Sequence, residues 1–167
     1  YRKKHDGSLL KYDVIREIGK GGFGVVYLAV ENPSKKKVAL KCTPKWRLDN
    51  PKIKRKLINE MTIHKSLDHP NIVTFLGTFH DDNFIYFILE LCEGGNVLEY
   101  INKFYKNQYD AKMHKCYSKI QNNLSYMTNQ NKTNFLPESE VVKITTQILK
   151  ALDYLHVNSR VIHRDIK

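Results

Sequence analysis

The feature that most constrains the fold is a glycine cluster followed at once by strand-forming residues. Four of the six residues from Gly19 to Gly24 are glycine, and Val25, Val26 and Tyr27 follow them. In dinucleotide-binding folds a G-x-G-x-x-G segment opens a helix, whereas β-branched and aromatic residues favour strands. The segment therefore predicts a hairpin between two strands. Its backbone N–H groups can approach a phosphate chain because no Cβ stands in the way, although a plain structural hairpin carries the same glycines.

Strands dominate the first part of the chain. Residues 9–43 alternate apolar and polar positions, with a turn at 32–34, and this pattern is typical of an antiparallel meander. Two more strands are predicted at 72–75 and 84–89, around a turn at 81–83. The chain therefore begins with a small antiparallel sheet.

Two helices are predicted, one between the strands and one near the end of the sequence. Asn50 and Pro51 fit the N-cap and first position of a helix that ends near 66–68, and a second helix opens at Pro137. Residues of one helix face recur at helical spacing in both: Ile53, Leu57, Met61 and His64 in the first, and Val141, Ile144, Ile148, Leu152 and Leu155 in the second. Residues 106–134, rich in Asn, Lys, Tyr and Ser and without a sustained period, are predicted to form an insertion or long loop.

Charge and cysteine content restrict the class of protein. Lys and Arg number 28 against 17 Asp and Glu, a net charge of +11 that favours a polyanionic partner. The longest wholly apolar run has six residues, far from the roughly 20 that span a membrane. Three irregularly spaced cysteines argue against a disulfide framework or a zinc site and fit a reducing compartment, so an intracellular location, cytoplasm or nucleus, is expected.

A lysine and a glutamate are predicted to form an ion pair. Lys41 ends the apolar strand that contains Val38 and Ala39. Glu60 lies beside the apolar stripe of the first helix, where a carboxylate is costly unless it is paired. Lys41 is the most economical partner, and the pair would orient a cation toward phosphates. A solvated Lys41 and a Glu60 at the helix rim remain the alternative.

The end of the sequence carries a second chemical signal. His163, Arg164, Asp165, Ile166 and Lys167 follow a short apolar segment. An Asp at the end of such a segment can accept a proton from a hydroxyl, and a Lys two residues later can offset charge on a transferring phosphoryl group. A charged loop without function is the alternative for this pentapeptide taken alone.

In combination these motifs resemble those of the eukaryotic protein kinase superfamily. The residues that carry the resemblance are Gly19, Gly21, Gly24 and Val26, the run 38–41, Glu60, the run 69–73 and the run 163–167. The Asp-x-Lys ending is similar to that of the serine/threonine group. Residues 60–69 and 87–92 look most like polo-like kinases, and the ending and the His-Pro-Asn-Ile run also suit Aurora-type kinases.

The resemblance implies a role for individual residues in ATP binding and catalysis. Asp165 would be the catalytic base, with Lys167 near the γ-phosphate and Lys41, paired with Glu60, on the α- and β-phosphates. The residues implied to contact the nucleotide are Gly19, Lys20, Gly21, Gly22, Phe23, Gly24, Val26, Ala39, Lys41, Leu89, Glu90, Cys92 and Asn96. Among them Leu89 would be the gatekeeper, while Glu90 and Cys92 would offer backbone groups to adenine. His64, Phe75 and His163 would stack between the lobes as structural residues.

The implied fold is α+β, a small lobe with a five-stranded antiparallel sheet and one helix, joined to the first part of a mainly helical large lobe. The small lobe would cover 9–90 and the hinge and start of the large lobe 91–167, with an Asn- and Lys-rich insertion at 106–134. The family's magnesium-holding Asn and Asp-Phe-Gly motifs would lie beyond Lys167, so no metal ligand is expected within the chain. Because Tyr1 is not Met, the chain is expected to be a fragment, able to contact ATP but a poor catalyst.

Three functions stay open on the sequence. The first is an ATP- and Mg²⁺-dependent serine/threonine protein kinase acting on protein hydroxyls. The second is a pseudokinase or nucleotide-binding scaffold, and the third is a basic nucleic-acid-binding module, disfavoured because Trp46 is the one aromatic residue in the basic run 35–56. Lys52, Lys54, Arg55 and Lys56 crowd the start of the first helix, where they form either a solvated face or a receptor for a regulatory phosphate or activator.

Overall fold

The computed structural model describes residues 2–3, 9–22, 24–104, 106, 136–164 and 166. The chain divides into two compact units, one made of Tyr1–Cys92 and Gln147–Lys167, the other of Glu93–Thr146. Most of the predicted insertion at 106–134 lies outside the described residues, as do Phe23, Asp165 and Lys167.

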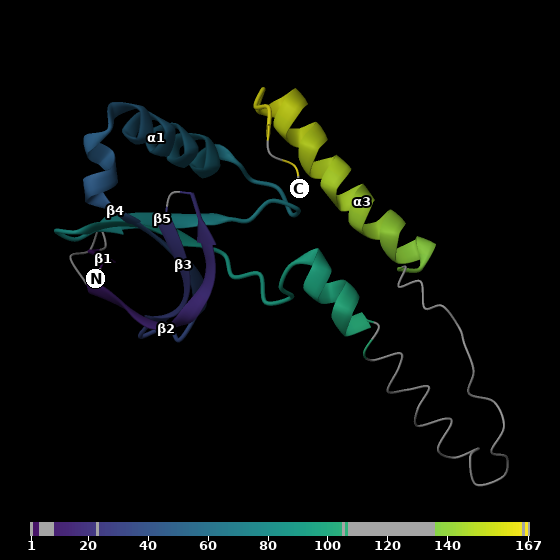
Figure 1. Cartoon of the computed structure of the whole chain (residues 1–167), viewed down its shortest axis with the longest axis horizontal. Helices are drawn as coiled ribbons and strands as arrows, with labels where there is room; N and C mark the ends of the chain where they lie inside the picture. The colour runs from purple at the N-terminus through teal and green to yellow at the C-terminus, as the bar shows by residue number, and fades with distance from the viewer. Residues whose placement is uncertain are drawn as a thin grey trace, which may run out of the picture. The chain divides into compact units, whose positions relative to one another are not determined.

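The first unit is built on an antiparallel sheet (Figure 1). The strands are β1 (Arg2–Lys3), β2 (Leu9–Gly21), β3 (Gly24–Asn32), β4 (Lys37–Pro44), β5 (Phe75–His80) and β6 (Phe84–Leu89). Their order in the sheet is β1-β2-β3-β4-β6-β5, and every neighbouring pair is antiparallel. The expected five-stranded sheet is confirmed in β2 to β6, and the short edge strand β1 is an addition that the sequence did not predict.

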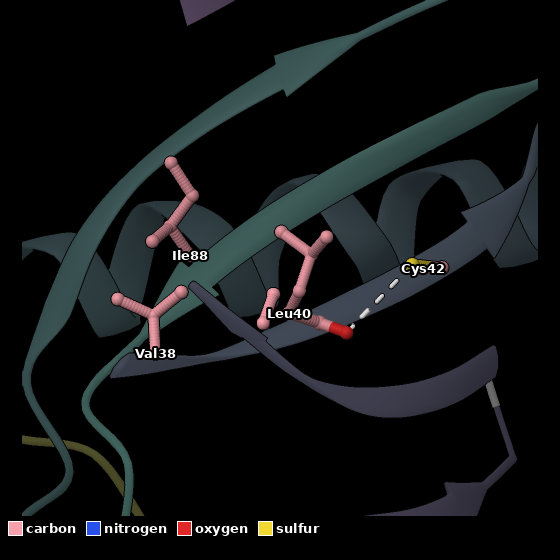
Figure 2. Close-up of a cluster of buried hydrophobic side chains, with 5 residues drawn as sticks. Val38, Leu40, Cys42 and Ile88 are labelled. Atoms are coloured by element: carbon pink, nitrogen blue, oxygen red, sulfur yellow. Dashed lines mark hydrogen bonds between the residues drawn. The ribbon is translucent and has the colours of Figure 1, made fainter. Parts of the chain in front are cut away.

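The hydrophobic core lies on one face of this sheet. Val38, Leu40 and Cys42 alternate along β4, and Ile88 projects from β6 beside them (Figure 2). The Cys42 thiol donates to the Leu40 carbonyl oxygen, with 3.7 Å between the sulfur and oxygen atoms. Because side chains of a strand alternate between faces, this face is set by every second residue.

The sheet is curved enough to bring β2 into contact with β5, although the two strands are not neighbours in the sheet. The ring of Tyr12 on β2 stacks on the ring of Phe79 on β5, with 5.4 Å between centroids, and Phe79 stacks in turn on Tyr86 at 4.5 Å. These rings pack against the buried cluster around Leu40. The core therefore occupies the concave side of a rolled sheet.

A helix covers the other side. After the short 3₁₀ segment η1 (Lys45–Asp49), α1 (Pro51–Ser66) begins at the predicted cap, where the Asn50 side chain accepts a hydrogen bond of 3.0 Å from the Lys52 N–H. Leu57 is the one fully buried residue of α1. The predicted start, N-cap and end of this helix are confirmed.

One strand prediction was wrong. The strand expected at 72–75 starts only at Phe75 and continues to His80. Gly77 interrupts its apolar pattern, adopting a φ of 152° at an irregularity in the pairing with β6, and this break hid the strand. The strand at Phe84–Leu89 and the turn before it are confirmed, and Asp81 Oδ1 caps that turn by accepting from the N–H groups of Asn83 and Phe84.

The described part of the chain contains further helices. Residues 97–104 are helical, and α3 (Glu138–Asp153) begins directly after Pro137 as predicted before ending in the wider π-type turn η2 (Tyr154–Asn158). Within the second unit the Tyr100 hydroxyl donates to the Glu140 carboxylate at 2.7 Å. No helix in the described part of the chain combines the length and the apolar character that crossing a membrane requires.

Candidate nucleotide-binding site

The glycine cluster forms the predicted hairpin. Gly21 pairs with Gly24 and Gly19 pairs with Val26, so the cluster turns β2 back into β3 and opens no helix. The prediction of a strand–loop–strand arrangement is thus confirmed at the backbone.

Two glycines of the hairpin have different surroundings. A Cβ on Gly24 would lie 1.9 Å from the Cys42 carbonyl oxygen, so glycine is needed for β3 to approach β4. A Cβ on Gly22 would meet no atom within 4 Å. The position of a Cβ on Gly22 is therefore uncrowded, whereas Gly24, at the base of the hairpin, is fixed by packing.

A contact that the sequence did not reveal holds the tip. The guanidinium of Arg47, in η1, donates to the Gly22 carbonyl oxygen. The two residues are 25 positions apart, and Arg47 belongs to a basic run with no distinguishing pattern, so no sequence signal marked it. The hairpin is thereby tied to the segment that precedes α1.

The expected ion pair between β4 and α1 is present. Lys41 Nζ lies 2.5 Å from Glu60 Oε1, and the Lys41 side chain is only 18% exposed. The Phe87 ring lies below the ammonium group at 6.0 Å from its centroid. An ion pair with one shielded partner holds its cation in a fixed place, as a phosphate-binding lysine requires.

The residues predicted to contact adenine share a sheet face with Lys41. In the strand register Val26 pairs with Lys41, Lys41 pairs with Phe87, and Ala39 pairs with Leu89. Directly paired residues project to the same face. Val26, Ala39, Lys41 and Leu89 are therefore gathered on the side that faces α1, opposite the core around Leu40. Lys20 pairs with Val25 and lies on the core side instead, so its side chain does not share the face of Lys41.

The segment after β6 is positioned by Thr74. The Glu90 N–H donates to the Thr74 carbonyl oxygen at 3.0 Å, and the Glu90 carboxylate accepts from the Thr74 N–H and hydroxyl. These hydrogen bonds hold the pKa of the Glu90 carboxyl below its usual range. Because the N–H is engaged, the backbone group that Glu90 can offer to adenine is its carbonyl. Cys92 is exposed, and Asn96 belongs to the second unit, where its side chain accepts from the Glu99 N–H at 2.8 Å.

A cavity of about 640 Å³ lies beside Glu60 within the first unit. Its lining includes His64, Leu155, His163 and Ile166. His64 Nε2 lies 2.6 Å from the Val73 carbonyl oxygen. The His64 and Phe75 rings are in contact, with 5.7 Å between centroids, but their planes are tilted by 55° rather than stacked, and their expected place between the lobes stays a prediction. Asp165, the predicted base, and Lys167 lie outside the described residues, although Arg164 and Ile166 are described.

Metal ligands do not gather in the described part of the chain. Among those residues no three His, Cys, Asp or Glu side chains are grouped so that they could hold an ion. The ammonium of Lys41 and the N–H groups of the hairpin are instead donors suited to an anion. The arrangement thus fits the phosphates of a nucleotide and supplies no magnesium site of its own among those residues.

Comparison with known proteins agrees with this chemistry. A family model described as a protein kinase domain matches residues 12–167. The chain is 33% identical over 150 residues to the cell cycle serine/threonine-protein kinase CDC5/MSD2 of Saccharomyces cerevisiae, covering 90% of the chain and 17% of that protein. It is 30% identical over 167 residues to Aurora kinase B of Drosophila melanogaster, covering 100% of the chain and 42% of that protein. It is 31% identical over 159 residues to serine/threonine-protein kinase PLK4 of Nematostella vectensis, covering 95% of the chain and 13% of that protein. The chain spans less than half the length of these relatives.

Proposed function

Because the chain belongs to the protein kinase family, we propose that it forms the ATP-binding part of a serine/threonine protein kinase that transfers the γ-phosphate of ATP to protein hydroxyls. The observation that carries the proposal is the 2.5 Å ion pair between Lys41 and Glu60, on the sheet face that also presents Val26 and Ala39. Polo-like and Aurora kinases are both among its relatives at about a third identity.

The residues of the chain have distinct tasks in this proposal. The backbone N–H groups of Gly19 to Gly24 bind the phosphates, and Lys41, oriented by Glu60, neutralises charge on them. Val26 and Ala39 cover the adenine, with Leu89 as gatekeeper and the Glu90 carbonyl and Cys92 N–H on the adenine edge. Asn96 binds near the ribose.

Proton transfer is assigned to the end of the sequence. Asp165 accepts the proton of the substrate hydroxyl, and Lys167 stabilises the charge that develops on the transferred phosphoryl group. Magnesium, which accompanies ATP in this family, supplies further charge neutralisation. The proposal assigns it no ligand among the described residues, because no suitable cluster occurs there.

The division of the chain follows the same proposal. Residues 9–90 form the small lobe, 91–167 the hinge and the start of the large lobe, and 106–134 an insertion. An intracellular site of action, cytoplasm or nucleus, is supported by the free thiols of Cys42 and Cys92. Protein serine and threonine hydroxyls are the proposed substrates, and no role for a membrane or nucleic acid is included.

The basic start of α1 is proposed as a regulatory site. Lys52, Lys54, Arg55 and Lys56 are all exposed, and the first turn contains no acidic residue. A phosphate bound there would relieve the repulsion between these cations and the helix dipole and would steady Glu60 toward Lys41. Replacing the four cations by Gln in the full-length protein is expected to remove any activation by phosphorylation and to spare basal activity. Activation that survives the change contradicts this assignment.

The substitution Lys41→Met tests the kinase proposal directly. In the full-length protein it should lower phosphotransfer to a protein substrate by orders of magnitude, because Lys41 orients phosphates and does little packing. The matched control is Lys65→Met, at the exposed end of α1, which should leave the rate unchanged. Equal turnover by the Lys41 variant and the unaltered protein would refute the proposal, whereas ATP binding without turnover in the unaltered protein would favour a pseudokinase.

A further inference from the structure

A second cavity opens on the sheet face opposite Lys41. It has a volume of about 450 Å³, within the range of ligand pockets. Lys41 pairs with Val26 and Phe87 on the nucleotide side, whereas the next residue, Cys42, pairs with Val25 and Tyr86 and lines this cavity. Alternation along the strands therefore separates the cavity from the proposed nucleotide site by the thickness of the sheet.

Four aromatic side chains contribute to its walls. Tyr27, Tyr86, Phe84 and Trp46 all line it, from β3, β6 and η1. Trp46 is 68% exposed and Phe84 37% exposed, although both are large hydrophobic side chains. The Arg47 guanidinium lies over the Trp46 ring at 5.4 Å from its centroid. Trp46 is exposed, whereas Tyr27, Tyr86 and Arg47 are half-buried. Tryptophan, tyrosine and arginine are the residue types that dominate protein-binding hot spots.

The charged residues that line the cavity are basic. Lys20 and Arg47 line it, and none of its described lining residues is acidic. The Asp81 carboxylate accepts from the lining residue Tyr86 at 2.6 Å and from two backbone N–H groups of its own turn. Glu17 pairs with the lining residue Tyr27 in the strand register but does not itself line the cavity. The chain as a whole carries a net charge of +11. An occupant with carboxylates complements this rim, and a second copy of the chain is repelled.

We propose that this cavity docks an acidic peptide segment of a partner protein, with an aromatic side chain in the hollow and carboxylates beside Lys20 and Arg47. The site would also act on the nucleotide hairpin, because Lys20, Gly21 and Gly24 line the cavity and Arg47 holds the Gly22 carbonyl. The partner surface is thus the reverse side of the loop proposed to bind phosphates.

The test measures binding of a fluorescent synthetic peptide to the 167-residue chain by anisotropy. The peptide has a central tryptophan between short runs of glutamate. Comparison peptides replace the tryptophan by alanine or the glutamates by lysine. Binding of the first peptide alone is expected, and it should weaken with added salt because exposed charges are screened.

Substitutions locate the binding site. Trp46→Ala should weaken binding about tenfold or more, the loss typical of a hot-spot aromatic residue, and Arg47→Gln should also weaken it. Lys65→Glu, at an exposed cation on α1, is the matched control and should leave affinity unchanged. Because Trp46 is mostly exposed, its removal should preserve the unfolding transition, which circular dichroism checks.

Four results would overturn the proposal. They are equal binding of the lysine peptide, equal binding of the peptide that lacks tryptophan, unchanged affinity of the Trp46 variant, and displacement of the peptide by excess ATP with magnesium. A chain that self-associates in sedimentation experiments and becomes monomeric on Trp46→Ala would also overturn it, since the occupant would then be a second copy.

Discussion

Adjacent residues of strand β4 have different surroundings because they project to opposite faces of the sheet. Val38 and Leu40 are 1% and 2% exposed in the core, while Lys41 points to the other face and pairs with Glu60 of α1. A slip of one residue in register would turn the ammonium group into the core and Leu40 away from it. The apolar face therefore fixes the register, and that register places the lysine.

The largest expected effect comes from the core face. Leu40→Ala should lower the free energy of unfolding by about 2–5 kcal/mol, because it removes buried methyl groups and leaves a cavity. Lys41→Met, one residue away, should change it by much less. Urea unfolding followed by circular dichroism measures both. Equal losses for the two variants would contradict the division of tasks between the faces.

A second contrast concerns two thiols. Burial raises the pKa of the Cys42 thiol to about 11, from 9.0, whereas Cys92 is exposed. A rise of this size lowers the thiolate fraction near pH 8 about a hundredfold. Iodoacetamide should therefore alkylate Cys92 well before Cys42 in the folded chain.

Peptide mass spectrometry of timed reactions measures this difference. In denaturant Cys42 should react readily, and this control shows that burial in the folded chain, rather than the thiol itself, slows the reaction. Rapid alkylation of Cys42 under folding conditions would mean that the core face opens on the time scale of the reaction, against the packing described above.

Periodicity accounts for what the sequence could predict. Alternation in β3 and β4 and the cap at Asn50 are local signals, so the hairpin, α1 and the Lys41–Glu60 pair followed from them. Both partners of that pair could be identified because a charged residue beside an apolar stripe needs compensation.

Long-range contacts account for what it could not predict. The start of β5 was misplaced because Gly77 breaks the apolar pattern, and its pairing with β6 determines the strand instead. Arg47 of η1 and Gly22 are 25 positions apart in the sequence, and the cavity near Trp46 is lined by residues from several strands and from η1. None of these features has a periodic trace in the chain.

At the base of the glycine hairpin, Gly24 of β3 lies close to the backbone of Cys42 in β4. Gly24→Ala should destabilise the fold by about 1–3 kcal/mol, as overpacking does, since its Cβ would lie 1.9 Å from the Cys42 carbonyl oxygen. Gly22→Ala is the matched control, because a Cβ there meets nothing within 4 Å. Melting temperatures of the two variants provide the comparison. A control that is as unstable as Gly24→Ala would show that hairpin flexibility, rather than close strand packing, explains the loss.

The smallest expected effect lies at the turn that leads into β6. Asp81 accepts hydrogen bonds from the Tyr86 hydroxyl and from the N–H groups of Asn83 and Phe84, and these hold its carboxyl pKa below the ordinary value of 3.8. A carboxyl whose pKa is lowered by folding stabilises the fold above its unfolded pKa. That contribution is lost as pH falls through the folded pKa.

Asp81→Asn should therefore lower the melting temperature slightly near neutral pH, and the difference from the unaltered chain should shrink at a pH of about 3. Asp82→Asn, at the exposed neighbouring position, is the matched control for the same change of residue type. If the difference in melting temperature for Asp81→Asn is instead constant with pH, the negative charge of Asp81 is not what stabilises the turn. The start of β6 would then depend on the hydrogen-bond geometry of the turn alone.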